Sequence, residues 1–121
     1  MRTGWVVAVA LICAPAGAQA MSVGEFLNKA NALKAKGIFA MGSPDIKLLQ
    51  SEMKGVSDAY RADLTAAQQA GRTPHSCPPP VGKARIGAKE LLAEFEAIPA
   101  AQRGMSVKAA FYAMMKKRFP C

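Results

Sequence analysis

The residue types that could do chemistry in this sequence are few, and most of them lie between positions 75 and 96. His75 and Cys77 form a His-x-Cys pair, and imidazole and thiolate are both zinc ligands. His75 is the only histidine among the 121 residues, so a Ser-His-Asp triad or a multi-histidine site cannot be built in the usual way. Cys77 is better used in a disulfide. We therefore expect no metal and no cofactor.

Three glutamates, Glu90, Glu94 and Glu96, resemble a carboxylate set for general acid–base catalysis. Glu90 and Glu94 are four residues apart and share one face of a predicted helix, whereas Glu96 points elsewhere. A solvated acidic face is the simpler interpretation. The sequence also lacks a Gly-rich phosphate loop, a Cys-x-x-Cys redox motif and an internal repeat. We therefore predict a protein that is not an enzyme.

The first twenty residues have the features of a cleavable secretory signal. Arg2 supplies a positive charge, residues 5–12 are apolar, and Ala18 and Ala20 are the small residues that signal peptidase accepts. The apolar run is shorter than the roughly 20 residues of a membrane span. We expect cleavage after Ala20 and a periplasmic protein without a stable membrane anchor.

Cleavage would remove Cys13 and leave two cysteines, Cys77 and Cys121, in a single domain over residues 21–121. An even cysteine count in an exported chain indicates one disulfide. Closing this loop stabilises the fold by about 4 kcal/mol at most in the chain-entropy model.

The charge balance limits the class of partner. The sequence has 16 Lys and Arg against 8 Asp and Glu, a net charge of +8 that becomes +7 without Arg2. An exported basic protein favours an acidic protein, anionic lipid or cell wall over nucleic acid. Only Lys116-Lys117-Arg118 forms a basic run, and a solvated helix end explains it most simply.

Gly and Pro divide the sequence after the signal into four predicted helices. Ser22 and Ser43 are typical N-caps, and Gly37 and Gly71 are typical residues just beyond a helix end. Gly55 interrupts the second helix, and close approach of a neighbouring helix is its expected reason, with a local bend as the alternative. The expected ranges are 22–36, 44–70, 83–97 and 106–119.

The last two predicted helices have similar lengths and a short connection, so we expect an antiparallel hairpin. Cys77 precedes its first arm and Cys121 follows its second, which brings both cysteines to the open end. Disulfide geometry requires Cα atoms within about 7 Å of each other. The predicted fold is all-α: a compact bundle of about four helices with one disulfide stapling the C-terminal helical hairpin.

The segment 71–82 is a non-helical connection that is rich in proline. A loop stiffened by prolines and tethered by a disulfide contacts a partner at low entropic cost. A plain connection is the simpler alternative. The candidate partner-binding residues are Arg72, Thr73, Pro74 and His75.

Several short motifs occur in a characteristic order. They are Gly55-Val56-Ser57-Asp58-Ala59, Cys77-Pro78-Pro79, Ile98-Pro99 and the closing Phe119-Pro120-Cys121. Over about residues 46–121 this order resembles the Tai/Rap family of periplasmic immunity proteins, which protect bacteria against type VI secretion amidases. Members often carry further cysteines where this sequence has Gln50 and Ser51. The resemblance implies an all-helical immunity domain, usually a homodimer, that occludes an amidase active site with a loop and helix surface.

The leading hypothesis is a non-enzymatic periplasmic protein that binds and inhibits a cell-wall amidase effector. The alternative is a small periplasmic helical stress chaperone, which exposes apolar surface when acid neutralises its carboxylates. Eight acidic residues supply little of that switch. A third class, cell-wall or anionic-lipid binding, rests on charge alone and would weaken with salt.

Overall fold

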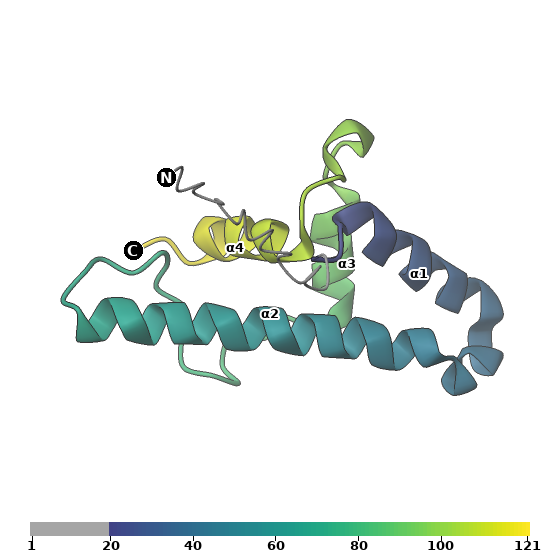
Figure 1. Ribbon diagram of the computed structural model, residues 1–121, viewed down its shortest axis with the longest axis horizontal. Coiled ribbons are helices and arrows are strands. Elements are labelled where there is room, and N and C mark those ends of the chain that lie inside the picture. The colour runs from purple at the N-terminus through teal and green to yellow at the C-terminus, as the bar shows by residue number, and fades with distance from the viewer. Residues whose placement is uncertain (1–19) are drawn as a thin grey trace, which may run out of the picture.

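A computed structural model describes residues 20–121 of the chain. The predicted signal sequence up to residue 19, with Cys13, lies outside the described residues. Over the described part the fold is all-helical, with four α-helices, two short 3₁₀ helices and no strands, which confirms the predicted fold class (Figure 1). Within residues 20–121, no helix has both the length and the apolar character that a membrane span requires.

The first helix, α1 (Val23–Lys36), begins and ends where the sequence predicts. The Ser22 hydroxyl accepts a hydrogen bond from the Glu25 backbone N–H at 3.1 Å. Gly37 ends the helix with a φ of +56°, a conformation that favours glycine. A 3₁₀ helix, η1 (Gly37–Gly42), then connects α1 to the next helix.

The longest helix, α2 (Pro44–Gln69), is also confirmed. Its N-cap Ser43 accepts a hydrogen bond from the Asp45 backbone N–H at 3.3 Å. At its other end the N–H of Gly71 (φ +67°) bonds to the Gln68 carbonyl, and the N–H of Arg72 bonds to the Ala67 carbonyl. This pair of bonds is a Schellman motif. With 26 residues, α2 is about 39 Å long and spans the molecule (Figure 1).

The expectation that a neighbouring helix approaches Gly55 is wrong. Gly55 is exposed, and no atom lies within 4 Å of a Cβ placed on it. The helix α2 continues through this position. Gly55 therefore costs conformational entropy when the helix forms, and no packing contact requires a glycine at this position.

We expect Gly55→Ala to raise the free energy of unfolding by about 0.5–1 kcal/mol, because alanine restricts the unfolded chain and its methyl group meets no neighbour. Thermal denaturation checks this result. Gly71→Ala is the matched control and should be destabilising, because a side chain is strained at a φ of +67°. A lower melting temperature for Gly55→Ala would contradict the interpretation.

The third helix, α3 (Ala88–Glu96), is shorter than the predicted range 83–97. Residues 83–87 are instead non-helical. Gly82, just before them, has a φ of +85°, and Arg85, among them, has a φ of +51°. Gly87 then caps the helix, and its N–H donates to a Glu90 carboxylate oxygen at 3.0 Å. The left-handed Arg85 is incompatible with a helix that begins at residue 83.

The last helix, α4 (Val107–Arg118), begins after the predicted N-cap Ser106, whose hydroxyl accepts from the Ala109 N–H at 3.0 Å. The starts of α1 and α4 are joined by backbone hydrogen bonds. The Val23 N–H donates to the Met105 carbonyl and the Val107 N–H to the Met21 carbonyl, both at 2.9 Å.

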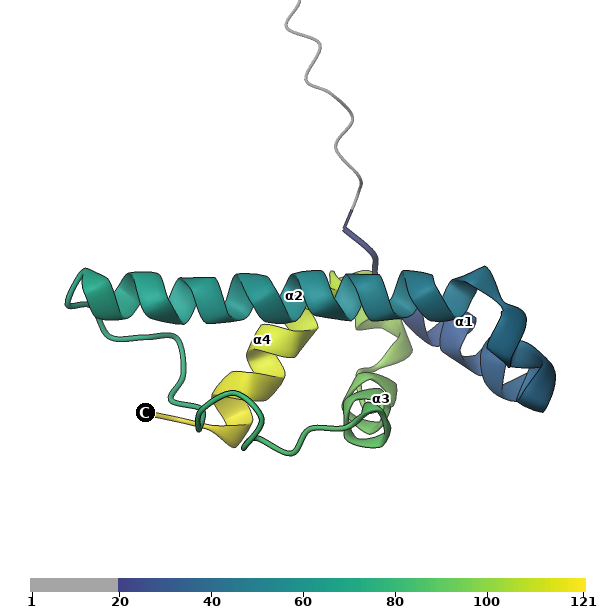
Figure 2. The same cartoon turned by 90° about the horizontal axis from the view of Figure 1, so that it is seen from below.

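The C-terminal helical hairpin differs in shape from the expected one. Ten residues, including the 3₁₀ helix η2 (Ala100–Gln102), separate α3 from α4. Figure 2 shows α3 end-on while α4 runs obliquely, so the two helices cross steeply. The α1, α3 and α4 helices all lie along one side of α2, where they enclose the core. Its buried members are Met21, Val23, Phe26, Leu27, Val56, Tyr60, Leu91, Phe95, Val107, Ala110, Phe111, Met114 and Met115.

Candidate functional site

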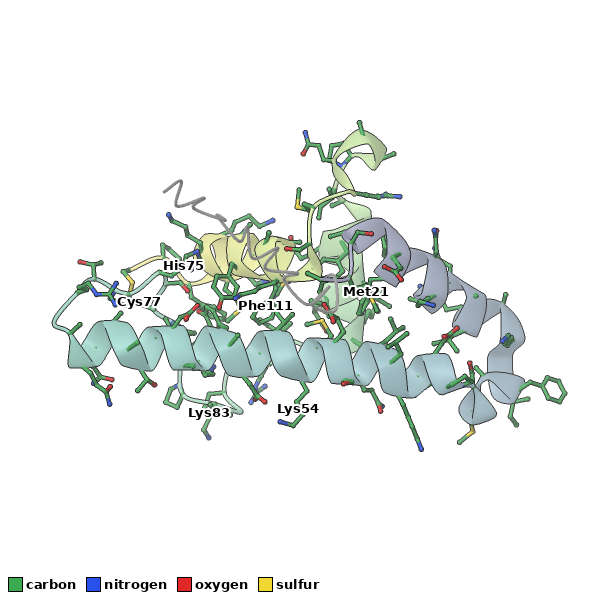
Figure 3. All side chains as sticks on the ribbon, viewed as in Figure 1. Met21, Lys54, His75, Cys77, Lys83 and Phe111 are labelled. Atoms are coloured by element: carbon green, nitrogen blue, oxygen red, sulfur yellow. A yellow bond between two sulfur atoms is a disulfide. The ribbon has the colours of Figure 1, made fainter. Side chains whose placement is uncertain are left out.

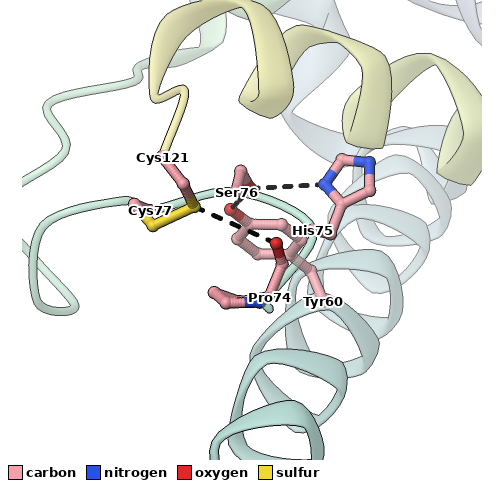
Figure 4. Close-up of a disulfide and its surroundings, with 6 residues drawn as sticks. All are labelled: Tyr60, Pro74, His75, Ser76, Cys77 and Cys121. Atoms are coloured by element: carbon pink, nitrogen blue, oxygen red, sulfur yellow. Dashed lines mark hydrogen bonds between the residues drawn. A yellow bond between two sulfur atoms is a disulfide. The ribbon is translucent and has the colours of Figure 1, made fainter. Parts of the chain in front are cut away.

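The predicted disulfide between Cys77 and Cys121 is present, with the two Cα atoms 4.9 Å apart (Figure 4). It fastens residues 71–82, which we call the clasped loop, to the residues that follow α4. The Cys77 N–H adds a backbone hydrogen bond to the Phe119 carbonyl at 2.8 Å. Because α3 begins at Ala88, the disulfide holds this loop and not the start of the third helix.

Ser76 is a buried residue of the clasped loop that attaches the loop to α2. It is 1% exposed, and its hydroxyl forms a hydrogen bond with the hydroxyl of Tyr60, which is also 1% exposed. The Nδ1 atom of His75 lies 3.3 Å from the same Ser76 oxygen (Figure 4). Within residues 20–121, every buried side-chain nitrogen and oxygen atom has a hydrogen-bond partner. The loop is therefore attached by a covalent bond and by a buried polar contact.

The rings of Tyr60, His75, Phe111 and Tyr112 form an aromatic cluster beneath the loop. Tyr60 meets Tyr112 and Phe111 edge-on at centroid distances of 5.3 and 5.4 Å, and the His75 ring is 5.3 Å from Tyr112. Such pairs add about 0.5–1.5 kcal/mol each beyond their burial. The cluster joins α2, α4 and the clasped loop.

Tyr112 also links α4 to α2 through its hydroxyl, which donates to the Asp63 carboxylate at 2.5 Å. Burial raises the pKa of Tyr112 above its ordinary value, and the hydrogen bond to Asp63 raises it further. A tyrosine is protonated at neutral pH even with its ordinary pKa, so the raised pKa of Tyr112 extends its role as donor into more alkaline solution.

The structure brings the four predicted contact residues together in the clasped loop, in unequal settings. Arg72, Thr73 and His75 are exposed, and Pro74 is partly buried. The Pro74 carbonyl oxygen lies 3.9 Å from Sγ of Cys121, a packing contact because a disulfide sulfur has no proton to donate. His75 presents one side to solvent and packs the other on the aromatic cluster.

The carboxylates that resembled a catalytic set have structural contacts. Glu90 accepts from the Gly87 N–H, and Glu94 pairs with Lys117 at 2.9 Å and Arg118 at 3.6 Å. Glu90 therefore caps the start of α3, and Glu94 forms ion pairs that link α3 to α4. In the part of the chain that the structure describes, no group of three or more His, Cys, Asp or Glu residues could hold a metal ion.

Two apolar surfaces were missed by reasoning from the sequence. The 3₁₀ helix η1 exposes Ile38, Phe39 and Met41 by 79%, 86% and 82%. A groove also opens between α1, α2, α3 and residues 81–88. The apolar run at residues 38–41 lies between two predicted helices and belongs to neither apolar face, which was the available signal for the first surface.

Comparison of the chain with protein-family models, with curated proteins and with solved structures found no match.

Proposed function

We propose that this protein is a periplasmic immunity protein that binds and inhibits a cell-wall amidase of a type VI secretion system, without enzymatic activity of its own. The observation that carries the proposal is the clasped loop, which presents Arg72 and Thr73 to solvent while both of its ends are fixed. The Schellman motif at Gly71 holds one end, and the disulfide at Cys77 holds the other.

Pre-organisation makes this loop suited to binding a protein. Ordering a flexible loop costs binding free energy, and a loop that is already ordered avoids most of that cost. Arginine is enriched at protein interfaces, where its planar guanidinium forms several hydrogen bonds. The excess of basic over acidic residues steers an acidic partner surface towards the protein.

The resemblance to the Tai/Rap family supplies the identity of the partner, and its motifs have structural roles here. Cys77 and Cys121 form the disulfide, and the Phe119 carbonyl accepts the Cys77 N–H. Pro99 lies three residues beyond the end of α3 and begins η2 as its N-cap. These roles support a shared scaffold. The resemblance further suggests a homodimer, which light scattering of the purified protein would detect.

The test of this proposal is co-purification with a candidate amidase followed by a peptidoglycan cleavage assay. An amidase encoded next to this gene is the first candidate. We expect a complex that survives gel filtration and an enzyme that no longer cleaves. Absence of both effects across the plausible cognate enzymes would contradict the proposal.

One observation favours a second candidate, a small helical chaperone. The apolar side chains of Ile38, Phe39 and Met41 are already exposed, so no acid-triggered opening is needed to uncover them. Exposed apolar patches of this kind bind unfolded chains. A light-scattering assay with an aggregating client protein separates the two functions. Suppression of aggregation that is lost when these three side chains become serine would favour the chaperone.

We expect Arg72→Ala and His75→Ala each to weaken binding to the amidase about five- to thirtyfold, because truncating a side chain that contributes to an interface removes about 1–2 kcal/mol. Calorimetric titration measures this affinity. Arg72 is exposed, so its variant should keep the melting temperature of the parent protein. Lys47→Ala, an exposed cation near the start of α2 and so at the opposite end of that helix from the loop, is the matched control. Unchanged affinity in both loop variants would remove the clasped loop as the binding site.

A further inference from the structure

The groove missed by the sequence analysis has a volume of about 1460 Å³. Its floor is α2, from Ile46 to Arg61, which corresponds to a length of about 22 Å. One wall is α1, and the other is α3 with residues 81–88. The groove therefore has the length of about four helical turns.

The lining of the groove is largely apolar and only partly covered. Leu49, Met53 and Ile86 pack against the core on one side and remain partly exposed on the other. Val81 is exposed at the edge of the groove. Contiguous exposed apolar surface of this kind marks an interaction site. A long and open groove suits an amphipathic helix better than a small molecule, which needs a more enclosed cavity.

The carboxylates that line the groove are already occupied. Asp58 binds the Lys54 ammonium group at 2.6 Å, and Glu90 accepts the Gly87 N–H at 3.0 Å. Asp58 is therefore neutralised by Lys54, whereas Glu90 keeps its charge and directs one oxygen towards the backbone of the groove wall.

The cations of the groove are less fully used. Within residues 20–121, Arg85 has no ion pair or hydrogen bond through its side chain. Arg61 donates a hydrogen bond from Nη1 of its guanidinium group to the Pro79 carbonyl oxygen at 3.3 Å. Lys83 is exposed in the segment 81–88 that forms part of the groove wall, next to the lining residue Gly82 (Figure 3). The edge of the groove is thus positively charged.

We propose that this groove binds an amphipathic α-helix of a partner protein, with an apolar face of about four turns flanked by acidic residues. The apolar side chains of that helix, spaced three and four residues apart, fill the space above Leu49, Met53 and Ile86. Its carboxylates pair with Arg85 and with the other cations of the edge. The groove shares Val81 and Gly82 with the end of the clasped loop but does not include Arg72 or His75, so this binding does not depend on inhibition of an amidase.

The experiment titrates the purified, disulfide-bonded protein with a fluorescein-labelled synthetic helix of 15 residues, with leucine on one face and glutamate on both flanks. Two further peptides serve as probes of chemistry. One has lysine in place of every glutamate, and the other has the same composition in an order without an apolar face. We expect saturable binding of the acidic amphipathic peptide and affinities about tenfold or more weaker for the other two.

Variants then place the binding in the groove. We expect Leu49→Glu and Arg85→Glu each to weaken binding about tenfold, because the first puts a charge on the apolar floor and the second reverses the charge of the edge. Leu48→Glu is the matched control, since Leu48 is exposed on α2 but does not line the groove. Circular dichroism confirms that each variant is folded.

Several results would overturn the proposal. One is no saturable binding of the acidic peptide, or equal binding of the three peptides. Another is equal affinity of the Leu49→Glu and Leu48→Glu variants. A third is a dimer, seen by light scattering, that dissociates only in Leu49→Glu, because a second copy of this chain would then occupy the groove.

Discussion

Replacing Cys77 and Cys121 with alanine is expected to lower the free energy of unfolding by about 3–4 kcal/mol. The two cysteines are 44 residues apart, and the chain-entropy model gives a crosslink of this length about 4 kcal/mol. A domain of this size has about 5–15 kcal/mol in total. The loss is therefore a large share of the stability, and it also releases the clasped loop.

Urea denaturation of the oxidised protein and of the double variant measures this difference. Adding reductant to the double variant is the control and should change nothing, whereas adding it to the parent protein should reproduce the loss. Hydrogen exchange at the Cys77 amide should accelerate in the variant, because its bond to the Phe119 carbonyl depends on the clasp. A difference below about 1 kcal/mol would show that the disulfide is not a principal stabiliser.

The second large effect is expected at Tyr60, a residue of α2 that contacts both α4 and the clasped loop. Its ring contacts Phe111 and Tyr112 of α4, and its hydroxyl holds Ser76 of the clasped loop. Truncating a large buried aromatic residue costs about 3–5 kcal/mol. We therefore expect Tyr60→Ala to destabilise the protein by about that amount, and also to leave the Ser76 hydroxyl with fewer partners.

Tyr60→Phe separates the ring from the hydroxyl. It keeps the aromatic contacts and removes only one buried hydrogen bond, so we expect a loss of about 1 kcal/mol. A cycle with Ser76→Ala tests the pairing, because the double variant should cost less than the sum of the single ones. Equal losses in Tyr60→Ala and Tyr60→Phe would contradict the importance assigned to the aromatic cluster.

The helix boundaries that the sequence predicts correctly are those set by neighbouring residues. Ser22, Ser43 and Ser106 each cap the helix that follows them, and Gly37 and Gly71 end helices with positive φ. Capping is a local interaction between residues two or three apart, so the sequence alone contains it.

The start of α3 could not be predicted in the same way. Gly87 caps it without a side chain, and Arg85 adopts a left-handed conformation that is rare for arginine. Neither the glycine cap nor the left-handed arginine leaves a pattern in the sequence that would distinguish this start from a helix beginning at residue 83. The apolar spacing that included Ile86 indicated a longer helix, whereas Ile86 packs against the core from the non-helical segment before α3.

The candidate site was predictable only in part. The loop, its exposed residues and its disulfide follow from prolines and cysteines that are visible in the sequence. The pairing of Tyr112 with Asp63, 49 residues away, depends on how α2 and α4 pack. The groove likewise depends on the relative placement of three helices. Such contacts have no local pattern.

The most direct test of the proposed function is titration of the protein into a peptidoglycan cleavage assay of a candidate type VI secretion amidase. We predict that cleavage falls in proportion to added protein and reaches background at a fixed stoichiometric ratio. The Arg72→Ala variant should require a clear excess to reach the same point. Full cleavage in the presence of excess protein, with no complex formed, would contradict the account.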